Sequence, residues 1–244
     1  MALRLFENFY KALNTLEEAE KEFKWEEMAL SVSKEGSDAN FLLYNPKILK
    51  RLSDYNAKEF IQKAMNLGGV VATIVLEKHK KDCFGAWEVL SSAVNEDLQG
   101  QGIGTKMYKI VMAYLGEPIT SDRYTVSKSA REVWKKLEKD PLAVSLPPEQ
   151  GEYQGAFDDK KHPVTPPKKD DCAIYAGGKD NPMNKAYAPS SDMRGEYSNL
   201  ISQLITNHDS FVRSWKELMA VWRSVDFLLL SLRLFRREYY HEED

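Results

Sequence analysis

The residues with the clearest chemical meaning are the three glycines of the segment QGQGIG, residues 99–104. The segment lies between a predicted strand, WEVLSSAV, and a predicted helix, TKMYKIVMAYL. The first turn of a helix carries unpaired backbone N–H groups and the positive end of the helix dipole. Glycines leave those N–H groups uncovered, so an anion such as a pyrophosphate can bind on them. The segment therefore predicts an anion-binding loop, with a tight strand-to-helix turn as the alternative.

The spacing of the glycines excludes two common phosphate-binding loops. The Walker A pattern G-x-x-x-x-G-K-[ST] is absent from the sequence. Gly100, Gly102 and Gly104 give G-x-G-x-G, whereas the dinucleotide fingerprint requires G-x-G-x-x-G in a βαβ unit. The pattern that fits is Q/R-x-x-G-x-G/A, with Gln99, Gly102 and Gly104 at the defined positions.

This pattern is the acetyl-coenzyme A loop of the GNAT superfamily of N-acetyltransferases, and the sequence resembles that family. The resemblance covers about residues 28–139, because a short strand in PITSD and a helix in KSAREVWKKLEKD follow the loop and its helix in the family order. It implies an α/β fold with a mixed central sheet flanked by helices. A narrower similarity, to GNAT-like proteins of tailed bacteriophages, rests on SDRYTVSKSAREVWKKL, the Pro-rich segment after it and DDC.

The resemblance implies acetyl-coenzyme A as the acyl donor and a set of residues that bind it. In the family, backbone groups of the fourth strand hold the pantetheine arm, and N–H groups of the loop hold the pyrophosphate. On this sequence the donor-binding residues are Ser92, Ala93, Val94, Gln99, Gly100, Gln101, Gly102, Ile103, Gly104 and Thr105.

Two positions bear on catalysis of acyl transfer to an amine, which needs a base for the amine proton. Glu88 lies on the predicted strand, 11 positions before Gln99, and resembles the base of the histone-acetyltransferase branch. The alternative for Glu88 is a solvent-facing strand residue. Many family members carry an acidic tyrosine four residues after a helix alanine, but here Trp134 follows Ala130. An indole N–H is not a useful acid, so Trp134 is expected in the core or in a pocket wall.

Other chemically interesting residues give no predicted site. Asp158, Asp159 and His162 have metal-ligand side chains, and so does the run Asp170–Cys172, but in a polar loop such groups are usually solvated. We expect no metal. Cys83 and Cys172 lack a CxxC partner, so neither a disulfide framework nor a nucleophilic cysteine is predicted.

Composition divides the chain into four segments. A helix is predicted over residues 1–27, the GNAT-like core over 28–139, an irregular Pro-rich arm over 140–194 and a helical appendage over 195–244. The arm holds six of the ten prolines between Pro141 and Pro167 and has little periodic apolar signal. Within 210–239 the apolar residues follow helical spacing. This stretch is predicted to dock on a partner chain, on a second copy or on the N-terminal helix.

The charge balance limits the classes of partner. The net charge is −3 and the pI about 5.9, so no basic excess exists for nucleic-acid binding. The longest apolar run, FLLLSLRLF, has nine residues and includes Arg233, which is too short to span a bilayer. The N-terminus has no clean apolar region of a signal peptide. A cytoplasmic protein is expected, in a host cell or in a virion if it is phage-encoded.

The sequence therefore favours a coenzyme-A-dependent N-acyltransferase, with acetyl as the expected group and an amine acceptor of unknown identity. The alternative is a GNAT-like fold without catalysis that serves as a phage structural, assembly or interaction protein. The missing tyrosine at position 134 is what keeps this alternative open, because function depends on the site and not on the fold.

Overall fold

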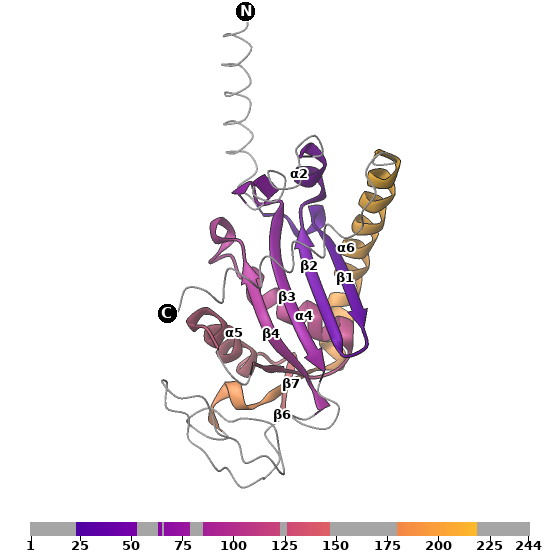
Figure 1. Ribbon diagram of the computed structural model, residues 1–244. Coiled ribbons are helices and arrows are strands. Elements are labelled where there is room, and N and C mark those ends of the chain that lie inside the picture. The colour runs from indigo at the N-terminus through magenta and orange to yellow at the C-terminus, as the bar shows by residue number, and fades with distance from the viewer. Residues whose placement is uncertain are drawn as a thin grey trace, which may run out of the picture.

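A single seven-stranded sheet organises the computed structural model, which describes residues 23–52, 63–64, 66–78, 85–122, 126–146 and 180–218. The strand order is β1-β2-β3-β4-β5-β7-β6, and helices flank the sheet (Figure 1). This mixed sheet confirms the predicted GNAT-like α/β fold. The strands are β1 (Ala29–Glu35), β2 (Asp38–Tyr44), β3 (Val70–Lys78), β4 (Trp87–Val94), β5 (Ile119–Ser121), β6 (Ala143–Leu146) and β7 (Ala186–Pro189). The helices are α2 (Pro46–Arg51), α4 (Ile103–Leu115), α5 (Lys128–Glu138) and α6 (Ser191–Leu218), with 3-10 turns η1 (Trp25–Glu27), η3 (Glu96–Leu98) and η5 (Pro182–Asn184).

The strands β1 to β4 form an antiparallel meander. Among them β3 (VVATIVLEK) is rich in β-branched residues, which favour strands, whereas β1 (ALSVSKE) holds one. Val32, Phe41 and Ile74 face one another across three adjacent strands, and all three belong to the main apolar core or pack against it. Among the strand pairs that the structure describes, only β4 with β5 is parallel, so the crossover helix α4 is needed between them.

Helices α4 and α6 lie together behind the sheet (Figure 1). Met107 and Val111 of α4 are fully buried in the main core, as is Leu204 of α6. Tyr197 and Ile201 extend the same stripe of α6 at spacings of four and three residues, which is the period of a helix face turned toward a core. Further along α6, Phe211 packs edge-on against Tyr44 of β2, with ring centroids 5.4 Å apart. The described part of this helix thus buries its apolar face within its own chain.

The predicted irregular arm, residues 140–194, supplies two strands at its ends, so that part of the sequence prediction was wrong. Strands β6 and β7 pair with each other, and β7 pairs with β5. Each has four residues, too few for a two-residue alternation to be recognised. Their stability comes from pairing with segments far away in the sequence, which no local pattern reports.

Several predicted features lie outside the described residues. These are residues 1–22 of the predicted N-terminal helix, residues 219–244 of the C-terminal appendage, Cys83, and the arm from 147 to 179 with Asp158, Asp159, His162 and Asp170–Cys172. Residues 25–27, which were predicted as the end of a long helix, form the short turn η1. In the described portion of the chain, no helix has the length and apolar character needed to cross a bilayer.

We expect Asn207→Ala to destabilise the fold by about 1–2 kcal/mol, because Asn207 fastens η1 to α6. Its Nδ2 donates to the carbonyl oxygens of Glu26 at 3.1 Å and Met28 at 2.7 Å. The exposed Ser202 lies on the same helix, and Ser202→Ala should change stability by less than about 0.5 kcal/mol. Urea unfolding measures both variants, and equal midpoints would contradict this role for Asn207.

Candidate functional site

The edge of β4 is left open by its short partner β5. The two strands pair at three positions, from Trp87 with Ile119 to Val89 with Ser121. Beyond Val89, the register between β3 and β4 shifts, and Leu90 is the extra residue of a β-bulge. The burial of β4 changes at the same place, from buried over residues 87–89 to half-buried over residues 90–94. The strand therefore offers backbone groups along residues 90–94 that β5 does not use.

The loop after β4 turns the chain into α4. Asn95 caps η3 by accepting a hydrogen bond from the N–H of Asp97, and the side-chain amide of Gln99 donates to the carbonyl of Val94 at 3.3 Å. Gly100 and Gly102 then have φ angles of 80° and 77°. An L-residue is strained in this left-handed region, so the turn itself requires these two glycines.

The N-terminus of α4 is not capped by a side chain. Gly102 is the N-cap residue, and the first intrahelical bond runs from the N–H of Lys106 to the carbonyl of Gly102. The N–H groups of Ile103, Gly104 and Thr105 precede that bond and point out of the helix end. A Cβ at Gly100 or at Gly102 would meet no atom of the described residues within 4 Å, so the described structure leaves space beside them.

Gly104 is the third glycine of the loop and lies in the first turn of α4. It has no positive φ. A Cβ built on it would lie 3.5 Å from Val94 Cγ2 and 3.9 Å from Val133 Cγ2, which is ordinary van der Waals contact. Glycine in a helix costs up to about 1 kcal/mol relative to alanine. Neither the turn nor the packing of the protein therefore needs a glycine here, and the loop pattern also accepts alanine at this position.

Glu88 is buried at the centre of the sheet, with 2% of its surface exposed. The solvent-facing alternative is therefore wrong, because β4 is the middle strand and is paired on both sides at this position. Glu88 lies opposite Glu77 of β3 and Thr120 of β5. Its neighbour Val89 belongs to the main core with α4, so the alternation of a strand puts Glu88 on the other face of the sheet.

Trp134 of α5 is a core residue, as one of its two expected roles proposed. Only 1% of it is exposed. Its ring lies edge-on to Tyr108 of α4 at 5.2 Å and stacks on Tyr187 of β7 at 5.6 Å. This aromatic cluster fills the space between α4, α5 and β7. Its indole N–H cannot serve as a general acid, so Trp134 does not replace the tyrosine that many family members carry and this chain lacks.

Several polar side chains next to the aromatic cluster join α5 to β7. Tyr187 Oη lies 2.8 Å from Glu138 Oε2 and 2.8 Å from the carbonyl oxygen of Pro182, and Lys185 Nζ lies 2.5 Å from Glu138 Oε1. Burial and the adjacent Glu138 carboxylate raise the pKa of Tyr187. Burial alone would raise the pKa of Glu138, but the bonds from Lys185 and Tyr187 hold it below its usual value. The group is ionic and structural, and sequence reasoning missed it because its members are 47 and 49 positions apart.

A pair of hydroxyl groups joins the Tyr108 side of the aromatic cluster to β4. Ser92 Oγ of β4 and Tyr108 Oη of α4 are 2.9 Å apart. Ser92 was predicted to lie on the donor-binding strand and to act through its backbone, whereas no role was predicted for Tyr108. The register puts Ser92 opposite Ile74, on the core face of the sheet, which is where α4 packs.

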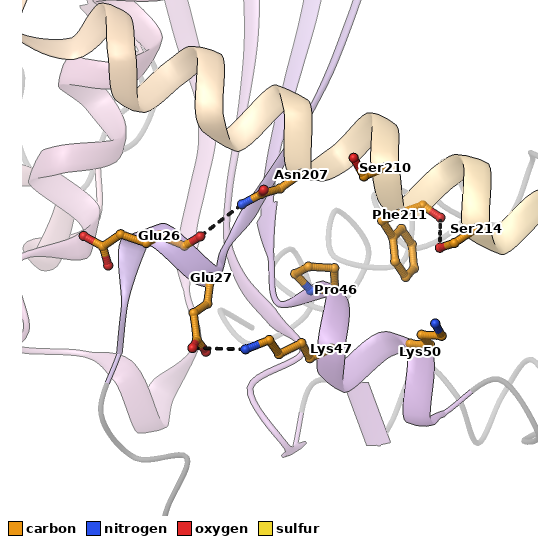
Figure 2. A pocket seen from close by; sticks show the side chains of 9 residues that line it. All are labelled: Glu26, Glu27, Pro46, Lys47, Lys50, Asn207, Ser210, Phe211 and Ser214. Carbon is orange, nitrogen blue, oxygen red and sulfur yellow. Dashed lines mark hydrogen bonds and ion pairs between the residues drawn. The ribbon is translucent and has the colours of Figure 1, made fainter.

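A groove of about 350 Å³ lies elsewhere, between η1, α2 and α6 (Figure 2). Two of its lining residues, Lys47 and Glu27, form an ion pair of 3.0 Å, and Asn207 projects from α6 toward Glu26. None of the predicted donor-binding residues lines this groove, so it is separate from the site at β4. Its lining residues are Glu26, Glu27, Pro46, Lys47, Lys50, Asn207, Ser210, Phe211 and Ser214.

Comparison with known proteins identifies the domain that carries the loop and β4. The model of the acetyltransferase (GNAT) family matches residues 14–138. No curated protein and no solved structure gave a significant match. The matched domain is that of N-acyltransferases that use an acyl-coenzyme A donor, and it describes the family as a whole without separating phage-type members. Because the match spans more than half of the chain, the chain belongs to the acetyltransferase (GNAT) family.

Proposed function

We propose that this protein transfers an acetyl group from acetyl-coenzyme A to an amine. The observation that carries the proposal is the position of the uncapped N-terminus of α4, which follows directly after the part of β4 that β5 leaves open. The two features together provide N–H groups for a pyrophosphate and backbone groups for an extended arm. This arrangement fits an acyl-coenzyme A better than it fits an isolated phosphate, which would need only the helix end.

The residues that would hold the donor are those at the open edge and the helix end. Ser92, Ala93 and Val94 would bind the pantetheine arm, and residues 99–105 would bind the pyrophosphate. Bound acetyl-coenzyme A supplies the thioester carbonyl that the amine attacks. Acetyl is the smallest common acyl group, and its preference over longer groups is part of the proposal.

Glu88 is proposed as the general base. The amine nitrogen must lose a proton as its bond to the carbonyl carbon forms and the carbon–sulfur bond breaks. The Glu88 carboxylate would accept this proton, directly or through one water. Coenzyme A leaves as a thiolate and takes one proton from solvent, because Trp134 cannot supply it. The sum is an amine and a thioester converted into an amide and a thiol.

A direct test measures thiol release from acetyl-coenzyme A in the presence of amines of different classes, such as polyamines, lysine peptides and peptide N-termini. Release that depends on one class, with the acetylated amine found by mass spectrometry, would support the proposal. The parallel measurement is the melting temperature with and without acetyl-coenzyme A, since a ligand at 100 times its Kd stabilises by about 2.7 kcal/mol. A chain that neither binds the donor nor releases thiol would contradict the proposal.

A second candidate function is a GNAT fold that acts by binding, without acyl transfer. The buried indole of Trp134 in place of the family's tyrosine favours it. This candidate predicts that acetyl-coenzyme A or a protein partner binds with no turnover on any amine tested.

We expect Gly104→Ala to keep both donor binding and the stability of the free protein. A methyl group fits beside Val94 and Val133 and favours the helix, so the stability of the free protein should stay the same or rise slightly. Because that methyl group points at these two side chains and the loop pattern accepts alanine at this position, the affinity for acetyl-coenzyme A should stay within about threefold of the parent. Calorimetric titration and thermal unfolding measure the two effects. A clear loss of affinity would show that the ligand needs a glycine at residue 104.

A further inference from the structure

The hydroxyl pair of Ser92 and Tyr108 connects the proposed donor edge to the interior of the domain. Tyr108 is 2% exposed and Ser92 is half-buried. Their oxygens are 2.9 Å apart, which is within the range for a hydroxyl–hydroxyl bond. Trp134 packs against the Tyr108 ring on the other side at 5.2 Å. The phenol is thus held in place by the aromatic cluster while its oxygen faces β4.

The burial of Tyr108 decides which hydroxyl donates. A buried O–H needs an acceptor, and in the described structure the oxygen next to the phenol is Ser92 Oγ. If Ser92 donated instead, the phenol proton would be left buried without an acceptor, at a cost comparable to a lost hydrogen bond. We therefore assign Tyr108 as the donor. A hydroxyl has one proton and can accept twice, so Ser92 keeps its own proton for a second partner.

Ser92 is well placed to offer that proton to a ligand. It is the middle residue of the stretch 90–94, which β5 leaves open and which is half-buried. We propose that the Ser92 hydroxyl donates a hydrogen bond to the carbonyl oxygen of the acyl thioester, and that Tyr108 is a positioning residue that orients it. This inference rests on the proposed function, because it requires acyl-coenzyme A along β4.

Tyr108 itself does not replace the missing tyrosine as an acid. Burial raises the pKa of Tyr108 to about 12. A thiol such as that of cysteine has a pKa of about 8.5, so transfer of the phenol proton to a thiolate is disfavoured by a factor on the order of 10³. Tyr108 therefore stays protonated and remains a constant donor to Ser92. The hydrogen bond from Ser92 polarises the carbonyl without moving a proton.

The test compares two ligands that differ only at the proposed acceptor. Acetyl-coenzyme A has the thioester carbonyl, and free coenzyme A does not. The double variant Ser92→Ala/Tyr108→Phe removes both hydroxyls together, so that no buried donor is left unpaired and the fold is retained. We expect it to bind acetyl-coenzyme A about 3- to 10-fold more weakly and free coenzyme A equally well. The matched control is Ser91→Ala, because Ser91 is the adjacent hydroxyl and faces Val75 on the opposite side of the sheet.

A spectroscopic signature separates a hydrogen bond from a general loss of fit. With acetyl-coenzyme A labelled with ¹³C at the carbonyl, the infrared stretch of the bound parent should lie below that of the free ligand. It should return toward the free value in the double variant and stay low in Ser91→Ala. Binding of both ligands by the parent, with no difference between them in the double variant and no change in the stretch, would overturn the role of Ser92. Failure of the parent to bind either ligand would instead overturn the proposed function.

Discussion

Gly102→Glu is expected to abolish the binding of acetyl-coenzyme A. The N–H groups of Ile103, Gly104 and Thr105 follow Gly102 at the uncapped start of α4, and within the described part of the chain no atom lies within 4 Å of the place for a Cβ on Gly102. A glutamate side chain would extend into that open space. Its carboxylate would compete for the same N–H groups and would repel a pyrophosphate. Thermal unfolding with excess ligand should show no stabilisation of the variant.

Strain has to be separated from charge in this experiment. Any L-residue at φ 77° costs roughly 1–2 kcal/mol, so Gly102→Glu lowers the stability of the free protein as well. Gly102→Ala carries the same strain with neither the length nor the charge, and it is the matched control. We expect Gly102→Ala to keep most of its stabilisation by the ligand. If both variants respond to acetyl-coenzyme A like the parent, the pyrophosphate does not bind at this loop.

Glu88→Gln is expected to lower turnover by roughly 100-fold or more at neutral pH, with little change in the affinity for the donor. The substitution keeps the size and the hydrogen-bonding shape of a side chain that is 2% exposed, but removes its ability to accept a proton. Steady-state kinetics with an identified amine acceptor measures kcat and KM separately.

The chain offers a close control for this variant. Glu77 lies opposite Glu88 on β3, carries the same carboxylate and is exposed. Glu77→Gln removes one negative charge from the same region of the sheet, and it should leave kcat within about twofold of the parent. An equal, small effect of the two substitutions would mean that Glu88 contributes only to the local field. A loss of donor affinity without a loss of kcat would make it a structural residue.

The fold was predictable where the sequence pattern is local. Strand β4, the glycine loop and α4 follow one another directly in the sequence, so each was recognised from neighbouring residues. Strands β6 and β7 were not, because each is short and is stabilised by partners that are distant in sequence. The six prolines between Pro141 and Pro167 also suggested an irregular segment and concealed the pairing at its two ends.

In the candidate site, too, the features set by neighbouring residues were predictable and those set by distant partners were not. The glycines and Glu88 were found from spacing, since the loop, the strand and the helix are contiguous. The burial of Glu88 was not predictable, because it depends on β5 pairing beside β4. The contact between Ser92 and Tyr108 is a side-chain pairing across a helix and a strand. Neither residue is distinctive in type, so no sequence signal could have indicated the pair.

The late position of β7 in the chain has a consequence for the order in which the domain is made. Thr120 of β5 pairs with Ala186 of β7, 66 positions further on. As the ribosome releases the chain, the glycine loop, Glu88 and α5 emerge well before Tyr187, on which Trp134 stacks. The entropy of closing so long a loop grows only slowly with its length, but long-range pairing slows folding. During synthesis the half of the sheet from β1 to β4 is therefore expected to fold first, and Trp134 to gain its second aromatic neighbour only when β7 docks.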